Sequence, residues 1–157
     1  MSLVMGKAHV MEVIGHYDVA SSFAASPMAC AAALASLDVM EEEDLSVRSK
    51  RLGYVLAQAI DGAQLPHVAE HRGRARGLFQ TLVVDEKPEQ GITARRIAAL
   101  CALRGVLVGN AANRLRLSPP LIISEEELIS SVDILASAFR DVARLGSFPG
   151  SGASIRG

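Results

Sequence analysis

The stretch from Arg114 to Glu127 limits the possible folds of this chain more than any other. It opens with Arg114-Leu115-Arg116-Leu117, an alternation typical of a strand with one buried and one exposed face. Pro119-Pro120 then stops the strand, because proline cannot donate to a sheet ladder. Ser124 and Glu127 have the spacing of a capping box, which predicts that a helix begins there. A strand is therefore followed closely by a helix, and the fold must combine sheet and helix.

The rest of the chain adds further elements of both kinds. Helices are predicted near Lys7–Ile14, from Pro27 with Ser26 as N-cap, from Leu45 with Asp44 as cap to Gly62, near Thr93–Arg104, and after Ser124. Strands are predicted at Ser2–Met5, at Leu78–Val84 with both faces buried, and in a hairpin that joins 106–108 to 114–117 across 109–113. This order predicts an α+β fold, with a small antiparallel-containing sheet covered by helices.

Charge and hydropathy exclude two classes of partner. The net charge of −1 and the lack of a basic stripe argue against a nucleic-acid or anionic-membrane partner. No apolar run reaches the roughly 18 residues of a membrane span. Neither nucleic acid nor a membrane is therefore an expected partner.

The cysteine and histidine residues are candidates for reactive thiols and metal ligands. Cys30 and Cys101 lie in alanine- and leucine-rich runs, which favours buried free thiols in a reducing compartment. His67, Glu70 and His71 follow a proline outside any predicted helix, and no further ligand has a fitting spacing. We therefore expect no metal site.

Four segments, in the family's order, resemble class III aminotransferases of fold type I, of the ornithine, acetylornithine and 4-aminobutyrate kind. Residues 19–30 look like the family's H-G-S-T-F-G-G-N-P-L-A-C, Ala32–Glu43 its A-A-L-E-V-L-E-E-E helix, and Arg72–Phe79 its V-R-G-R-G-L. Arg114–Glu127 resembles I-R-L-S-P-P-L-I-I-x-E-E-E and is the most specific match. The resemblance runs from about Ser2 to Arg144 and implies the C-terminal small domain of an enzyme that uses pyridoxal 5'-phosphate.

The resemblance also implies roles for particular side chains. Ser22 stands where the family places a threonine that binds the cofactor phosphate of the neighbouring subunit, and Ser21 lies beside it. A hydroxyl before a helix N-terminus suits a phosphate, although both serines could be ordinary loop hydroxyls. Arg116 stands where the family keeps the arginine that holds the substrate carboxylate, a task that suits a planar guanidinium. The alternative for Arg116 is a solvated edge-strand arginine.

The chain departs from the family in the predicted cofactor loop. Ala24, Ala25 and Ser26 replace two glycines and an asparagine, and Val19-Ala20 replaces the histidine-glycine pair. If those glycines need positive φ, each alanine costs on the order of 1 kcal/mol. The loop is therefore expected to differ in shape, and phosphate binding with it.

The family's Schiff-base lysine has no counterpart here. It lies in an S-K-x-L-G-G-G context just before the strand that Ser2–Gly6 resembles, whereas Lys7, Lys50 and Lys87 all lack glycine-rich surroundings. Pyridoxal phosphate also needs an acid for its ring nitrogen and a ring to stack on, which would lie further upstream. We therefore expect no transamination by this chain alone and assign no catalytic residue to it.

These observations predict a domain plan and leave the function between alternatives. Residues 1–26 are interpreted as a remnant of the large domain's last strand and the cofactor-contacting loop, 27–145 as the small domain, and 146–157 as a flexible tail. The first hypothesis is part of an aminotransferase that moves an amino group between an ornithine-like ω-amino donor and a 2-oxo acid, as a homodimer or with a large catalytic domain. The second is a free-standing, non-catalytic binding or interaction module. An unrelated small enzyme ranks last, and the expected compartment is the cytoplasm, with the mitochondrial matrix also compatible.

Overall fold

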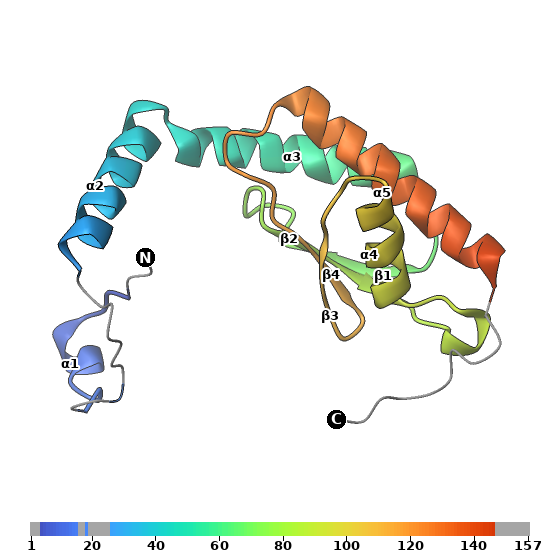
Figure 1. Cartoon of the computed structure of the whole chain (residues 1–157), viewed down its shortest axis with the longest axis horizontal. Coiled ribbons are helices and arrows are strands. Elements are labelled where there is room, and N and C mark those ends of the chain that lie inside the picture. The colour runs from blue at the N-terminus through green and yellow to red at the C-terminus, as the bar shows by residue number, and fades with distance from the viewer. Residues whose placement is uncertain (1–3, 16–17, 19–25, 147–157) are drawn as a thin grey trace. The chain divides into compact units, whose positions relative to one another are not determined.

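The computed structural model describes residues 4–15, 18 and 26–146 (Figure 1). They divide into two compact units, residues 1–44 and residues 45–157. Within the described ranges, no helix is long and apolar enough to cross a membrane.

The first unit consists of two helices that bury no residue. α1 spans Ala8–Met11 and α2 spans Pro27–Glu42. α2 begins at proline as predicted, because the fixed φ of proline suits the first helical position. Ser26, however, makes no side-chain capping hydrogen bond. Val4 and Met5 form no strand, and the remainder of the strand predicted there lies outside the described residues.

The second unit is a four-stranded sheet with three helices. Its helices are α3 (Leu45–Ala63), α4 (Ala94–Leu103) and α5 (Glu125–Leu145), with the short 3-10 turn η1 at Pro88–Gln90. Its strands are β1 (Val68–Arg72), β2 (Gln80–Val84), β3 (Gly109–Ala111) and β4 (Arg114–Leu117). The order β1-β2-β4-β3 is antiparallel throughout, so the predicted α+β class with a small antiparallel sheet is confirmed (Figure 1).

Apolar side chains from the sheet and all three helices form one core. Leu82 and Leu115 face this core from neighbouring strands, and Leu52 of α3, Ile97 of α4 and Phe139 of α5 meet them. Each of the five is fully buried. Leu52 and Leu56 of α3 and Val132, Leu135 and Phe139 of α5 recur at helical spacing in the sequence, and all of them line this core.

The capping box predicted at the start of α5 is confirmed. The Ser124 hydroxyl accepts from the Glu127 backbone N–H, and the Glu127 carboxylate accepts from the Ser124 backbone N–H at 3.0 Å. Hydrogen bonds from Ser124 lower the pKa of Glu127, because they favour the charged carboxylate. Asp44, expected as the cap of α3, instead adopts φ 48°.

Three strand predictions need correction. β2 starts at Gln80 and alternates buried and half-buried residues, because helices cover only one face of the sheet. The first strand of the hairpin is Gly109–Ala111, not 106–108, and a tight turn with Ala112 at φ 49° leads into β4. β1 was missed, because its sequence Val-Ala-Glu-His-Arg is largely exposed and has no apolar run.

A close approach between α3 and the loop before β2 fixes the sheet against the helix. A Cβ at Gly53 would lie 2.4 Å from the carbonyl carbon of Gly77, so only glycine fits there. Gln80 is fully buried at this crossing, where its amide nitrogen donates to the carbonyls of Gly53 at 2.7 Å and Gly77 at 3.0 Å. The buried amide nitrogen of Gln80 thus has two acceptors at this crossing.

Candidate functional site

The outer face of the sheet carries polar and charged side chains in two cross-strand rows. In one row β2 places Thr81 opposite Arg116 of β4, with Arg72 and Gly109 on the flanking strands. In the other row Val83 lies opposite Arg114, flanked by Glu70 and Ala111. Side chains alternate along a strand, so Arg114 and Arg116 share this face while Leu115 and Leu117 enter the core.

Arg116 lies over the strand beside it. A Cβ added to Gly109 would be 3.4 Å from Nε and 3.7 Å from Nη2 of Arg116, so the guanidinium extends across β3 where no side chain intervenes. Arg116 is exposed and makes no hydrogen bond or ion pair with other residues in the described part of the chain. The guanidinium is therefore free to hold a planar anion through parallel hydrogen bonds. Gly109 was not identified from the sequence, because its role depends on the register of β3 with β4.

The other charges on this face differ in how they are paired. Glu70 and Arg72 form an ion pair of 2.6 Å. The hydrogen bond from Arg72 is the main cause of the lowered pKa of Glu70, and the charge of Arg114 lowers it further. Arg72 lies within β1, and Arg74 pairs with Asp61 of α3. The face has a surplus of positive charge around Arg114 and Arg116.

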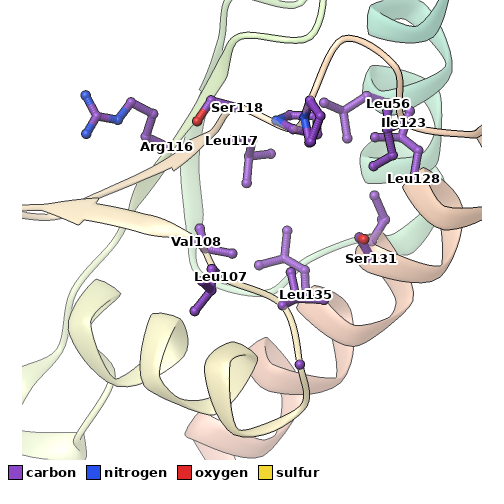
Figure 2. Close-up of a pocket in the computed structure, with 15 residues that line it drawn as sticks. Leu56, Leu107, Val108, Arg116, Leu117, Ser118, Ile123, Leu128, Ser131 and Leu135 are labelled. Carbon is purple, nitrogen blue, oxygen red and sulfur yellow. The ribbon is translucent and has the colours of Figure 1, made fainter.

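A cavity of about 270 Å³ lies on the helix side of the sheet (Figure 2). Its walls are apolar and come from α3, from the segment after α4, from the end of β4 with Pro119-Pro120, and from α5. Arg116 borders the cavity, but Figure 2 shows its side chain pointing away from the apolar residues that line it. The cavity and the exposed guanidinium are therefore separate features.

His71 borders a second cavity, of about 360 Å³, together with Asp61 and Gln64. Because Gln80 donates through its nitrogen to two carbonyls, its oxygen faces His71 Nε2 at 2.6 Å, and that ring nitrogen must carry the proton. Nδ1 is buried and has no partner among the described residues. Burial is the main cause of the lowered pKa of His71, so the neutral ring is favoured.

The residues expected to contact the cofactor cannot be placed. Ser21 and Ser22 lie outside the described residues. Of the lysines, Lys7 and Lys50 are exposed, and Lys87 lies 3.7 Å from the carboxylate of Asp85. Among the described residues, no lysine lines the cavity beside Pro119-Pro120 or the cavity beside His71. The described residues do not, by themselves, make a site that fits pyridoxal phosphate.

The remaining candidates give no further site in the described residues. No group of His, Cys, Asp and Glu within residues 4–15, 18 and 26–146 could hold a metal ion. Cys30 and Cys101 are free thiols, as predicted, and Cys101 is fully buried whereas Cys30 is half-buried. Burial raises the pKa of Cys101 to about 11, so this thiol is unreactive at neutral pH.

Comparison with known proteins places this arrangement in one family. The family model for Aminotransferase class-III matches residues 1–139. The ornithine aminotransferase of Emericella nidulans is 32% identical over 146 residues, which are 92% of this chain and 32% of that protein. Ornithine aminotransferase 1 of Staphylococcus aureus (strain MRSA252) is 34% identical over 143 residues, covering 90% of this chain and 33% of that protein.

Solved structures agree with the sequence comparison. The acetylornithine aminotransferase of Elizabethkingia anophelis superimposes with a TM-score of 0.68 at 30% identity, over 84% of this chain and 34% of that chain. The ornithine aminotransferase of Toxoplasma gondii gives 0.68 at 30% identity, over 90% of this chain and 33% of that one. The chain thus spans about a third of the length of the relatives that it matches.

Proposed function

Because this chain belongs to the class III aminotransferases, we propose that it is the small-domain part of an enzyme that moves an amino group between an ornithine-like ω-amino donor and a 2-oxo acid. The names of the relatives support this donor class, since they are ornithine and acetylornithine aminotransferases. The family depends on pyridoxal phosphate, which supplies an electron sink when it is bound. The proposal includes two expectations from the sequence: domain boundaries after residues 26 and 145, and assembly as a homodimer.

The exposed Arg116 is the observation that carries the proposal. Its guanidinium lies across Gly109, on the opposite side of the sheet from the core, without a partner in the described ranges. A substrate carboxylate would provide the two acceptors that a guanidinium binds best. We assign Arg116 to the binding of the substrate carboxylate, as its position in the family motif implies.

The rest of the enzyme must then supply the lysine that holds the cofactor. Lys7, Lys50 and Lys87 are the chain's lysines, and none of them lines a described cavity. Ser21 and Ser22 are proposed to contact the cofactor phosphate in the assembled enzyme, where the positive end of α2 would favour an anion. The chain by itself is expected to be inactive.

A fusion enzyme tests the proposal directly. The part of the Emericella nidulans ornithine aminotransferase that this chain does not match would be joined ahead of residues 1–157. We expect the fusion to show cofactor absorbance and to transfer the amino group of ornithine to a 2-oxo acid, and the chain alone to do neither. A soluble, folded fusion without cofactor absorbance would contradict the proposal.

Arg116→Gln and Arg114→Gln form a matched pair in that fusion. Losing charged hydrogen bonds worth about 1.5–3 kcal/mol should lower kcat/KM about 10–100-fold for Arg116→Gln. Arg114→Gln changes the same charge on the same face and should change kcat/KM less than about threefold, the scale of an exposed charge. Equal decreases of kcat/KM in the two variants would contradict the assignment of Arg116 to binding of the substrate carboxylate.

One observation keeps a second candidate function open to test. Residues 45–146 enclose a core of their own, in which Leu52, Leu82 and Phe139 are fully buried. That is compatible with a free-standing, non-catalytic binding module. A monodisperse chain that neither binds pyridoxal phosphate nor gains it in the fusion would favour this second function.

A further inference from the structure

The apolar cavity beside Pro119-Pro120 is suited to receive a side chain from another polypeptide segment. Leu56, Leu128, Val132 and Leu135 form its walls and are almost fully buried themselves. Ser131, a polar residue in the α5 wall, already donates its hydroxyl to the carbonyl of Glu127 at 2.7 Å. An apolar cavity of roughly 150 Å³ accommodates a benzene ring. The volume of about 270 Å³ is therefore ample for a bulky apolar side chain.

The rim of this cavity exposes apolar surface. Leu107 lines the cavity and is 90% exposed, and Ile122, next to the lining residue Ile123, is 67% exposed. Single exposed leucines are common on protein surfaces, but exposed apolar residues next to an apolar cavity indicate an interaction surface. Figure 2 shows Leu107 and Ile123 on opposite sides of the cavity.

Arg48 holds one side of the rim in place. From α3 it donates hydrogen bonds to the carbonyls of Leu121, Ile122 and Ile123, the last at 2.8 Å. Arg51, on the next turn of α3, pairs with Glu125 at 2.7 Å. Charge-assisted bonds to successive carbonyls fix the backbone and keep Ile122 exposed. A backbone that is already held in place loses little conformational entropy when the surface around it is covered.

We propose that this cavity is the docking socket for an apolar side chain from the part of a class III aminotransferase that lies outside the third matched by residues 1–157. The chain matches only 32% of the Emericella nidulans enzyme, so about two thirds of such an enzyme can provide the occupant. The inference rests on the proposed function, and it assigns one contact surface within the assembled enzyme. The guanidinium of Arg116 points away from the apolar residues of this surface (Figure 2).

Cysteine protection tests the socket. Leu107→Cys and Arg140→Cys would each be placed in a Cys30→Ser background, in the full chain and in the fusion described above; Cys101 is fully buried and its thiol stays unreactive. Arg140 is an exposed residue of α5 and serves as the matched control. We expect both cysteines to react rapidly in the chain alone. In the fusion, Cys labelling at 107 should slow about tenfold or more, because the thiol reacts only when the contact opens.

The labelling rates distinguish failure of the docking socket from failure of the proposed function, and they distinguish other occupants of the cavity. Equally fast labelling at position 107 in a fusion that binds pyridoxal phosphate would overturn the socket and leave the proposed function standing. Protection at 107 in a folded fusion without cofactor would support the socket and contradict the function. Slow labelling in the chain alone would also overturn the socket: if it speeds up on dilution the occupant is a second copy, and if not, another ligand.

Leu107→Asp provides a second measurement that does not depend on labelling. Leu107 is exposed in the chain alone, so this change should leave its thermal unfolding within about 1 °C. In the fusion a buried carboxylate at the socket should weaken docking, and cofactor retention should fall several-fold. Unchanged retention would contradict the proposal.

Discussion

Helices α2 and α5 are both long and rich in apolar residues, yet their surroundings are opposite. α5 buries seven side chains against the sheet and its neighbouring helices, from Leu128 to Val142. α2 buries none, and Met28, Leu34 and Leu37 are largely exposed. Apolar residues lie along one stripe in α5, but they occur on all sides of α2. Burial of an apolar stripe therefore stabilises α5, whereas no side chain of α2 is buried among the described residues.

Core and surface truncations should give the largest difference between the two units. Phe139→Ala removes a fully buried ring and should lower the free energy of unfolding by about 3–5 kcal/mol. Leu34→Ala removes an exposed side chain of α2 and should change it by less than about 0.5 kcal/mol. Urea denaturation measures both. A large loss for Leu34→Ala would show that α2 is already packed in the isolated chain.

Two glycines of α3 should respond to alanine with opposite signs. Gly53→Ala places a Cβ 2.4 Å from the backbone of Gly77 and should destabilise by about 1–3 kcal/mol or more, the range for overpacking. Gly62 has no neighbouring atom within 4 Å of the added Cβ, so Gly62→Ala should stabilise by about 0.5–1 kcal/mol through helix propensity. Thermal unfolding of the two variants would distinguish packing from propensity. Stabilisation by both would contradict the close approach.

The two helix N-termini provide a smaller contrast. Ser124→Ala removes a complete capping box and should cost about 1 kcal/mol. Ser26 makes no capping hydrogen bond, so Ser26→Ala should have almost no effect on the same free energy of unfolding. Equal losses would mean that Ser26 caps α2 in solution.

The smallest expected effect is a pH dependence due to His71. The pKa of His71 is lowered in the folded chain, chiefly by burial and in part by the charge of Arg74, while Gln80 and Asp61 oppose the shift. The unfolded chain therefore takes up the proton first, and the stabilisation from neutral His71 is present above its ordinary pKa of about 6.5 and lost as the pH falls below it. Urea midpoints between pH 7.5 and 5 should fall less for His71→Gln than for the natural chain. An identical fall would exclude His71 as the cause.

Local signals predicted much of the fold. The capping box at Ser124, the proline at the start of α2 and the apolar stripes of α3 and α5 each depend on neighbouring residues, so they can be read without tertiary contacts. The strand alternation around Arg116 was equally local and predicted correctly which side chains face outward. The boundaries of the strands were less accurate, because sheet pairing selects them.

The candidate site was predicted only in part. Arg116 was identified from the family motif. Its accessibility, however, depends on Gly109, and only the pairing of β3 with β4 places this glycine beside Arg116. The hydrogen bond between Gln80 and His71 was not predicted from the sequence. A glutamine at the start of an apolar strand does not reveal which residues of α3 and of the neighbouring strand its amide will contact. The roles of Ser21 and Ser22 remain predictions.

By itself, the sequence determined the family, the α+β class and the places where the main helices begin, because these depend on residue identity and on spacing over a few positions. Only the tertiary structure decided that the Arg116 side chain points away from the apolar residues of the cavity that it borders, and that glycine is required where α3 meets the loop before β2. Those features depend on contacts between residues far apart in the chain, and their distances follow from packing of the whole core.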